Sequence, residues 1–516
     1  MAAESYAFNL LGEDLEALAL ESSPNPKRTL WLSSRHPRSG LALRRREDPR
    51  KFPSHDRGFC DLEDDGSNLR GNLVVGSITE LNRWLENHGD VSRTLQNAFG
   101  RGELDLVSGG PPCQSFSMAG LRRQNCEKNT LPWEFAKFVG RASPKFVLLE
   151  NVSGILKPFK DSAGGKFYAW FELAKAFAEI GYFPLCLHVN AKYVGVAQNR
   201  QRFLLLAVRE DVYEALKGTF SDSERALFRK VEPFYAAVKQ EQPIDTAMLD
   251  CWDVERDLDA KLLQKSFLSA LVRLRTPNAQ LVSASDAIGD IGALHEQGYS
   301  THRLGAHGRK LANEFEGVAR LPTALANHDL RNNSELVQRR FRLYQVLAGL
   351  DRPTRSSVIS VLNGHSTDID DRVWAALREH DFLKETGERK RFASRAELLE
   401  FLQRHRTKKR TQRALQAKKQ APATVSIPDD ACHYESLRTL TVRELARLQS
   451  FPDGFVFKSK ITTGGAMRSY EVPQYTQVGN AVPPLLGRAL GFAIAVLLKR
   501  LNLARAERSR ATKLVA

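Results

Sequence analysis

The sequence is organised around Gly109–Ser117, which reads GGPPCQSFS and follows the apolar run Leu104–Val107. A short apolar run closed by two glycines and two prolines predicts a buried parallel strand that ends in a rigid loop, where α/β proteins place their ligands. Because proline fixes φ and removes a backbone donor, this loop can hold Cys113 at a constant position. A thiol held in this way is a candidate nucleophile, whereas an isolated cysteine is more often a small buried apolar residue.

The residues that follow predict more strands of the same sheet. Pro144–Leu149 is a second buried strand, and it delivers Glu150 to the sheet edge that carries the thiol. The aromatic residues between 167 and 177 recur at helical spacing, and the runs 185–189 and 203–208 form a strand pair. Helices that cross over between strands predict an α/β, doubly wound (Rossmann-like) domain.

Four segments divide the chain. Residues 1–70 lack a clear period apart from a short helix over Glu13–Leu20, so we expect a poorly organised segment there. Residues 71–209 form the first part of the sheet domain, with a strand at Asn72–Val75 and a helix capped by Thr79. Residues 210–435 are an inserted domain of mixed structure, and residues 436–516 return to the first domain.

Within the insertion, a basic segment runs from Arg389 to Gln420. Ser394 and Glu397 predict a capping box, followed by a helix that continues into the lysines and arginines as far as Lys419. Such a run is often only a solvated helix face, but it also suits salt-sensitive contact with phosphates.

Composition indicates which class of partner the protein binds and in which compartment it works. A net charge of +16 and a pI near 9.6 indicate a polyanionic partner. The six cysteines are too far apart in the sequence to indicate a disulfide framework or a metal site. The N-terminus has no signal pattern. We expect no membrane span, because the apolar helix Leu485–Leu501 is too short and is capped, with Pro484 near its first turn. These features predict a cytoplasmic protein.

Five ordered motifs give the chain a family resemblance. It is similar to the DNA (cytosine-5) methyltransferases in two blocks, about residues 71–209 and 436–516, through Gly109–Gln114, Glu150–Val152, Gln198–Arg202, Arg443–Pro452 and Gly479–Val482. The resemblance implies a methyltransferase sheet with an inserted target-recognition domain, S-adenosylmethionine as the cofactor and double-stranded DNA as the partner. It also implies a modification enzyme, of the kind found in restriction-modification systems, that associates with the nucleoid.

The resemblance assigns roles to named residues. Cys113 resembles the thiolate that adds to C6 of a flipped-out cytosine, Glu150 the acid near N3, and Arg202 the group that holds O2, with Arg200 alongside. The cofactor-binding positions match Ser77, Ile78, Pro112, Asn480 and Val482.

The chain also departs from the family pattern. Residues 1–75 contain no F-x-G-x-G loop for the cofactor, and Ser77 stands where an aspartate is usual. Tyr193 and Ala197 replace a more usual aspartate and proline. The missing loop predicts weak autonomous cofactor binding and either a truncated gene product or a split enzyme, in which a second chain supplies the loop.

Two functions therefore remain open. The first is an active DNA methyltransferase, alone or with a partner, and the second is a DNA-binding remnant without catalysis. Retention of Cys113, Glu150, Arg200 and Arg202 as a set favours the first function, and the missing loop favours the second. An RNA substrate is less favoured, because RNA enzymes of the other type carry their thiol where this chain has Glu150–Val152.

Overall fold

The computed structural model describes residues 2–21, 25–112, 130–160, 165–317, 322–409, 412–423, 427–465, 467 and 471–515. Cys113 and the rest of 113–129 lie outside the described residues. The chain forms two compact units, which we describe one at a time. The sheet unit consists of Ala3–Gly195, Arg200–Gln280 and Val482–Ala516, and the insert unit consists of Met1–Ala2, Val196–Asn199 and Leu281–Ala481.

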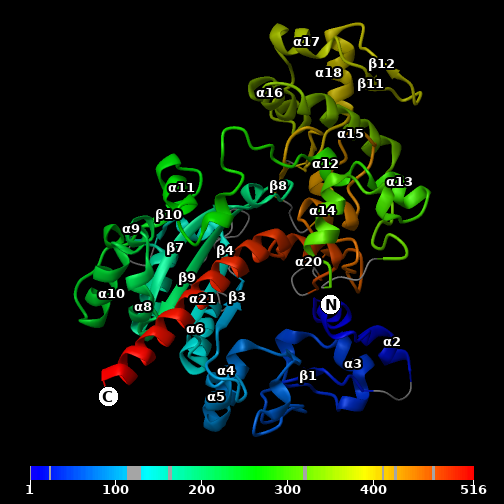
Figure 1. The fold of residues 1–516 in the computed structure, drawn as a ribbon. Helices are drawn as coiled ribbons and strands as arrows, with labels where there is room; N and C mark the ends of the chain where they lie inside the picture. The colour runs from blue at the N-terminus through cyan, green and yellow to red at the C-terminus, as the bar shows by residue number, and fades with distance from the viewer. Residues whose placement is uncertain are drawn as a thin grey trace. The chain divides into compact units, whose positions relative to one another are not determined.

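The sheet unit contains a five-stranded mixed sheet in the order β10-β7-β9-β4-β3 (Figure 1). Its strands are β3 (Leu106–Gly109), β4 (Phe146–Val152), β7 (Tyr182–Asn190), β9 (Gln201–Arg209) and β10 (Cys251–Asp253). The pairs β3–β4 and β7–β10 are parallel, whereas β9 runs antiparallel to both of its neighbours. The central strands are almost wholly buried, as expected of a sheet covered by helices on its faces. The predicted α/β architecture is therefore confirmed.

Helices surround this sheet, and their apolar residues explain its burial. α7 (Ala169–Glu179) packs on β7 through the predicted aromatic stripe, and Gly181 follows it with a φ of 89°. The other helices of the unit are α1 (Ala2–Tyr6), α2 (Leu15–Leu20), α3 (Leu41–Arg46), α4 (Ile78–Asn87), α5 (Gly89–Gln96), α6 (Leu131–Ala142), α8 (Glu210–Leu216), α9 (Asp222–Phe228), α10 (Val231–Lys239), α11 (Asp257–Gln264) and α21 (Pro484–Val515). A small hairpin pairs β5 (Phe159–Lys160) with β6 (Lys166–Phe167).

The N-terminal segment corrects one expectation, because residues 2–70 are organised wherever the structure describes them. β1 (Thr29–Trp31) pairs in parallel with β2 (Leu73–Val75) in a separate two-stranded sheet. Trp31 packs with Ala7, Leu15 and Leu41 in a buried cluster. Sequence periodicity missed this core because each short element contributes only one or two apolar side chains.

Asp61 closes the second edge of β1. The Trp31 amide donates to Asp61 Oδ2 at 2.9 Å, and the Asp61 amide donates to the Trp31 carbonyl at 2.9 Å. Arg44 holds the same carboxylate at 2.5 Å, and both side chains of this ion pair are almost completely buried. The edge of β1 that faces away from β2 is therefore already occupied at Trp31.

The insert unit is mostly helical and has its own core. Its helices are α12 (Ala284–Ile288), α13 (Ile291–Glu296), α14 (Ala306–Glu314), α15 (Glu335–Ala348), α16 (Arg352–Leu362), α17 (Asp371–Leu377), α18 (Arg395–Arg404), α19 (Val442–Leu448) and α20 (Gln474–Asn480). Its short strands are β8 (Gln198–Asn199), β11 (Phe382–Leu383), β12 (Arg389–Lys390), β13 (Arg413–Ala414), β14 (Ala421–Pro422) and β15 (Ala431–Cys432). One buried cluster extends from Phe341 on α15 to Leu402 on α18.

The structure moves the predicted domain boundaries. We expected the insertion to begin at residue 210 and to end at 435, but residues 210–280 stay with the sheet, and the insert unit continues to Ala481. The reason for the first difference is β10, which joins the edge of the sheet beside β7 in a register that pairs Cys251 with Cys186. A three-residue strand surrounded by polar residues carries too little periodicity to be recognised in the sequence.

The C-terminal helix is longer than predicted. α21 runs to Val515. By length and composition alone, the stretch Gln474–Arg510 is long and apolar enough to cross a membrane. The prediction that this helix is too short for a membrane span was therefore wrong. The buried core helix of a soluble protein passes the same test. In the sheet unit, α21 packs against α8, and Arg500 forms an ion pair with the buried Glu224 at 2.8 Å.

Candidate functional site

The site is built where the loop after β3 passes the carboxyl end of β4. Gly109 and Gly110 permit this close approach. A Cβ on Gly109 would lie 2.5 Å from the ring of Phe135, and one on Gly110 would lie 3.3 Å from Glu150 Oε2. Asn151 Nδ2 donates to the Pro111 carbonyl at 3.4 Å. Because β3 and β4 are parallel neighbours, the loop that leads to Cys113 begins beside Glu150, as the sequence predicts.

Glu150 meets the two predicted arginines at this edge. It lies within β4 rather than after it, and Arg202 stands on the adjacent antiparallel strand β9, opposite Val152. Arg202 Nε lies 2.6 Å from Glu150 Oε1, with 11% and 15% of the two side chains exposed. Arg200 is 1% exposed. The structure therefore brings together Glu150, Arg200, Arg202 and the start of the Cys113 loop.

The surroundings disfavour charge at two of these groups. Burial raises the pKa of Glu150, and the positive charges of Arg202 and Arg200 offset this effect only in part. Burial, reinforced by the charge of Arg202, holds the pKa of Arg200 well below its ordinary value. A carboxyl group with a raised pKa can keep its proton and donate it to a bound base.

Glu255 was missed by the sequence analysis, although it fixes the segment that leads to Arg200. Glu255 accepts hydrogen bonds from Asn190 Nδ2 and from the Tyr193 hydroxyl, both at 2.7 Å, and Lys192 Nζ lies 2.9 Å away. These contacts give Tyr193, the residue that departs from the family pattern, a structural role. The sequence holds no local signal for Glu255, because it lies more than sixty residues from its partners.

The expected cofactor residues lie at several separate places. Ser77 is the N-cap of α4 and accepts from the Thr79 amide at 3.3 Å, so the expectation that Thr79 is the cap was wrong. Ile78 opens the same helix. Pro112 is exposed at the end of the described loop. Asn480 ends α20 in the insert unit, and Val482 begins the last segment of the sheet unit.

The turn before α2 does not fit the methionine carboxylate of S-adenosylmethionine. The amides of Gly12 and Glu13 both donate to the Ala7 carbonyl, and the carboxylate of Asp14 accepts from the amides of Glu16 and Ala17. A carboxylate ligand needs free backbone donors of the kind that a glycine loop supplies. The acidic side chains of Glu13 and Asp14 would also repel it.

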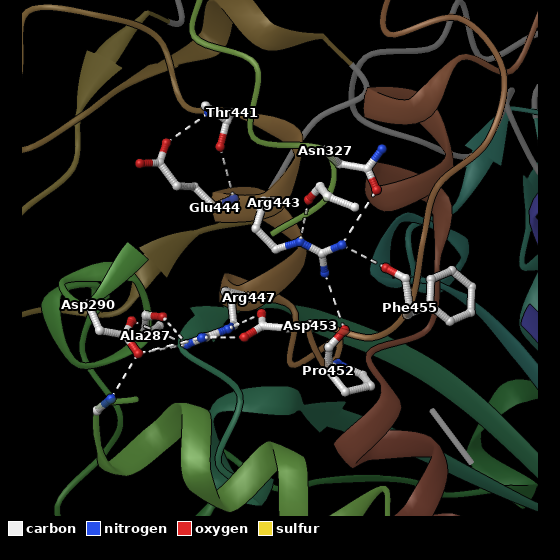
Figure 2. A network of polar contacts seen from close by, with 12 residues as sticks. Ala287, Asp290, Asn327, Thr441, Arg443, Glu444, Arg447, Pro452, Asp453 and Phe455 are labelled. Carbon is white, nitrogen blue, oxygen red and sulfur yellow. Dashed lines mark hydrogen bonds and ion pairs between the residues drawn. The ribbon is translucent and has the colours of Figure 1, made fainter. Parts of the chain in front are cut away.

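A second cluster of buried charge lies in the insert unit, on the motif Arg443–Pro452 (Figure 2). Arg447 donates to Asp453 at 2.5 and 2.7 Å and lies 3.3 Å from Asp290. Arg443 donates to the carbonyls of Ala326 at 2.9 Å and Phe455 at 2.7 Å. The predicted capping box of α19 is confirmed, since Thr441 and Glu444 exchange hydrogen bonds.

This network ties distant segments of the insert unit together. Both arginines are completely buried, and the carboxylates of Asp453 and Asp290 raise the pKa of Arg447 above its ordinary value. The sequence indicated a motif of the family resemblance here but no role for its arginines, because Asp290 lies 157 residues away along the chain.

Basic residues after α18 differ from expectation. α18 ends at Arg404, so the lysines and arginines that follow lie outside the helix. Ser394 caps the helix by accepting from the Glu397 amide at 3.3 Å, whereas Glu397 accepts from the amide of Ala393 and not from that of the cap.

Among the described residues, no group of three or more His, Cys, Asp or Glu side chains is arranged to hold a metal ion.

Comparison with known proteins places this site in a family. The family described as C-5 cytosine-specific DNA methylase matches residues 80–280 and 329–495. The fold is that of an S-adenosylmethionine-dependent methyltransferase, with an α/β sheet and an inserted unit. The chain belongs to the C-5 cytosine-specific DNA methylase family. It is accordingly a DNA (cytosine-5) methyltransferase, and S-adenosylmethionine is its methyl donor.

Named relatives extend over most of the chain. The type II methyltransferase M.DdeI of Desulfomicrobium norvegicum is 26% identical over 406 residues, which are 78% of this chain and 75% of the relative. The type II methyltransferase M.AgeI of Thalassovita gelatinovora is 26% identical over 420 residues, which are 77% of this chain and 84% of the relative. Among solved structures, the Dnmt2 methyltransferase of S. pombe aligns with 84% of this chain and 86% of its own at 12% identity and a TM-score of 0.34.

Proposed function

We propose that Cys113, Glu150, Arg200 and Arg202 form the pocket in which this methyltransferase holds its target cytosine. The observation that carries the proposal is the position of Glu150. Its carboxyl group has a raised pKa, lies 2.6 Å from Arg202, and borders a loop that reaches Cys113 three residues after Gly110. A structural ion pair on the surface would need neither the burial nor the adjacent loop.

The chemistry explains why these residue types are needed. C5 of cytosine is a poor nucleophile, so the thiolate of Cys113 first adds to C6 and forms a sulfur–carbon bond. Electron density then moves toward N3, where a proton from Glu150 neutralises it, while the guanidinium of Arg202 holds O2. S-adenosylmethionine supplies an electrophilic methyl group for C5. Loss of the C5 proton and departure of the thiol then restore the aromatic base.

Covalent trapping tests this assignment. DNA that contains 5-fluorocytosine should form a stable adduct with the protein in the presence of cofactor, because fluorine cannot leave as a proton does. Cys113→Ala should form no adduct and should still bind DNA. An equal adduct with the Ala variant would show that another residue is the nucleophile.

We propose that the insert unit selects the DNA sequence. It lies between two parts of the catalytic domain in the chain, and its core is separate from the sheet. Its exchange for the corresponding unit of a relative should change the methylated sequence but not the chemistry. An unchanged site preference after the exchange would contradict this role.

We also propose that a second polypeptide completes the cofactor site with a glycine-rich loop. Two observations support this proposal. The backbone amides of Gly12 and Glu13 before α2 are bonded within the chain, and β1 and β2 form a two-stranded sheet that is separate from the sheet containing β3. Lost hydrogen bonds to buried polar groups cost about 1–3 kcal/mol each, so we expect weak binding of S-adenosylmethionine to this chain alone. Calorimetry provides the test, and micromolar binding without any added chain would overturn the proposal.

The names of the relatives support a proposal for the biological setting of the enzyme. Two of them are type II methyltransferases, and we propose that this protein modifies DNA in a restriction-modification system in the cytoplasm. Methylation that protects DNA from a nuclease encoded by a neighbouring gene would support this setting, and the absence of such protection against every neighbouring nuclease would contradict it.

A further inference from the structure

Among the described residues, most of the cations that follow α18 lack an acidic partner. Five exposed cations lie between the end of this helix and β14, and among the described residues none of them forms an ion pair with a carboxylate. They are Arg406, Lys408, Arg413, Lys418 and Lys419. Lys409, in the same stretch, is the exception, because it lies 2.9 Å from Asp429.

Four cations on and before α18 are paired with carboxylates instead. Arg395 lies 2.6 Å from Asp368 and 3.0 Å from Asp371. Arg404 forms ion pairs with Glu400 and Glu385. Lys390 and Arg391 are also paired with acidic side chains. A phosphate would have to displace these carboxylates, so α18 presents a weaker surface to DNA than the number of its basic residues indicates.

Two of the unpaired cations stand on a rigid turn. The Ala284 amide donates to the Lys419 carbonyl at 2.8 Å, and the Ser285 amide donates to the Ala417 carbonyl at 2.9 Å. The Lys419 amide in turn donates to the Gln416 carbonyl at 3.1 Å. Backbone bonds on both sides therefore fix the turn, while the side chains of Lys418 and Lys419 remain exposed.

This turn leads directly to the motif that carries the base-pocket arginines. β14 follows Lys419 by two residues and pairs in parallel with β8, so that Ala421 is opposite Gln198 and Pro422 is opposite Asn199. The Ala421 amide donates to the Ala197 carbonyl at 2.9 Å. Arg200 is the next residue of the chain after β8. The two lysines are thus fixed to the strand from which the chain enters the proposed cytosine pocket.

We propose that Lys418 and Lys419 form a phosphate clamp, which holds the backbone of the substrate DNA. This inference rests on the proposed function, since it names the contact that positions the substrate of the same site. The clamp contributes affinity and register but no sequence preference, because phosphates carry no sequence information. Release of counterions from the contacted phosphates makes its contribution dependent on salt.

The experiment compares two double variants that lose the same charge. Lys418→Gln/Lys419→Gln removes the clamp, and Arg395→Gln/Arg404→Gln removes two cations that are already paired. Binding to a duplex of arbitrary sequence is measured by fluorescence anisotropy over a series of sodium chloride concentrations. The slope of log K against log salt is negative. For the lysine variant it should become shallower by roughly 0.9 per lost contact, or about 1.8 in all, and the unfolding temperature should stay unchanged. The arginine variant should keep the wild-type slope.

Each outcome decides one claim. An unchanged slope in the lysine variant, or an equal loss in both variants, would overturn the clamp and leave the methyltransferase function intact. A wild-type chain that binds no duplex DNA at any salt concentration would instead contradict the proposed function itself. Methylation assays on the same variants separate the two further, because loss of the clamp should raise KM for DNA and leave kcat nearly unchanged.

Discussion

The protein buries Arg447 in the insert unit and Arg200 in the sheet unit, and the surroundings shift the pKa values of these two side chains in opposite directions. In the insert unit, Arg447 is completely buried, and the carboxylates of Asp453 and Asp290 raise its pKa. In the sheet unit, Arg200 is almost as deeply buried, but burial and the nearby charge of Arg202 lower its pKa. The difference therefore lies in the neighbours and not in the depth of burial.

Glu444 in the insert unit and Glu150 in the sheet unit repeat this contrast. Glu444 lies 2.7 Å from Arg438, and hydrogen bonds and charge lower its pKa in spite of its burial. Glu150 lies 2.6 Å from Arg202, yet burial raises its pKa. A cluster in which carboxylates and arginines neutralise each other stabilises the fold. A cluster in which burial disfavours the charged forms is suited to bind a ligand that supplies the compensating charge.

The largest expected effect is on catalysis at the sheet unit. Glu150→Gln should slow methyl transfer by about 10²–10⁴-fold, because the amide cannot donate a proton to the base. The free energy of unfolding should stay unchanged or increase, since the variant removes a carboxyl group that burial disfavours when charged. Single-turnover kinetics and urea denaturation measure the two quantities, and a fall in stability with unchanged kinetics would make Glu150 a structural residue.

The next effect is on stability in the insert unit. Arg447→Met should lower the free energy of unfolding by about 3–5 kcal/mol, because it leaves Asp453 and Asp290 buried without their cation. Arg447→Met/Asp453→Leu should recover part of this loss, since it also removes one stranded charge. Denaturation of the three proteins checks the order, and a single variant as stable as the wild type would show that the network does not hold the unit together.

The smallest effect is a pH dependence of opposite sign in the two units. The folded protein binds the proton of Glu150 more tightly than the unfolded chain, so its contribution to stability is lost as pH rises from the ordinary pKa of 4.5 through the raised value. Glu444 contributes stability above its ordinary pKa of 4.5, and this contribution is lost as pH falls through the lowered value.

Two glutamine variants measure this effect. Urea denaturation between about pH 3 and about pH 8 should show the wild type losing its advantage over Glu150→Gln as pH rises. The wild type should gain its advantage over Glu444→Gln over the same range. If the unfolding free energies of both variants changed with pH in parallel with that of the wild type, the two clusters would not differ in the way described.

The parts of the fold that were predictable are those with strong local patterns. The buried strands around Val147 and Leu205 are long apolar runs, and the capping box at Thr441 needs only four residues of sequence. Motif order then indicated that Glu150, Arg200 and Arg202 would meet, and the structure brings these side chains together.

The features that were missed depend on tertiary contacts. β10 is recognisable only when β7 lies beside it, and the core around Trp31 collects single side chains from several short elements. Glu255 and Asp290 act on partners far along the chain, so no spacing in the sequence reveals them. The charge run Arg389–Gln420 was recognised, but the sequence could not separate the paired arginines of α18 from Lys418 and Lys419, which form no ion pair within the part of the chain that the structure describes.

Hydrogen exchange at C5 of the target cytosine is the sharpest test of Cys113 as the nucleophile, because it requires addition of the thiol but no methyl transfer. Addition of Cys113 to C6 makes the hydrogen on C5 exchangeable, so DNA labelled with tritium at C5 of cytosine should release tritium to water when the wild-type protein is added without cofactor. Release should be abolished in Cys113→Ala and strongly slowed in Glu150→Gln, while both variants keep their affinity for DNA. Equal release by the wild type and Cys113→Ala, or no release from DNA that the wild type binds, would contradict the account.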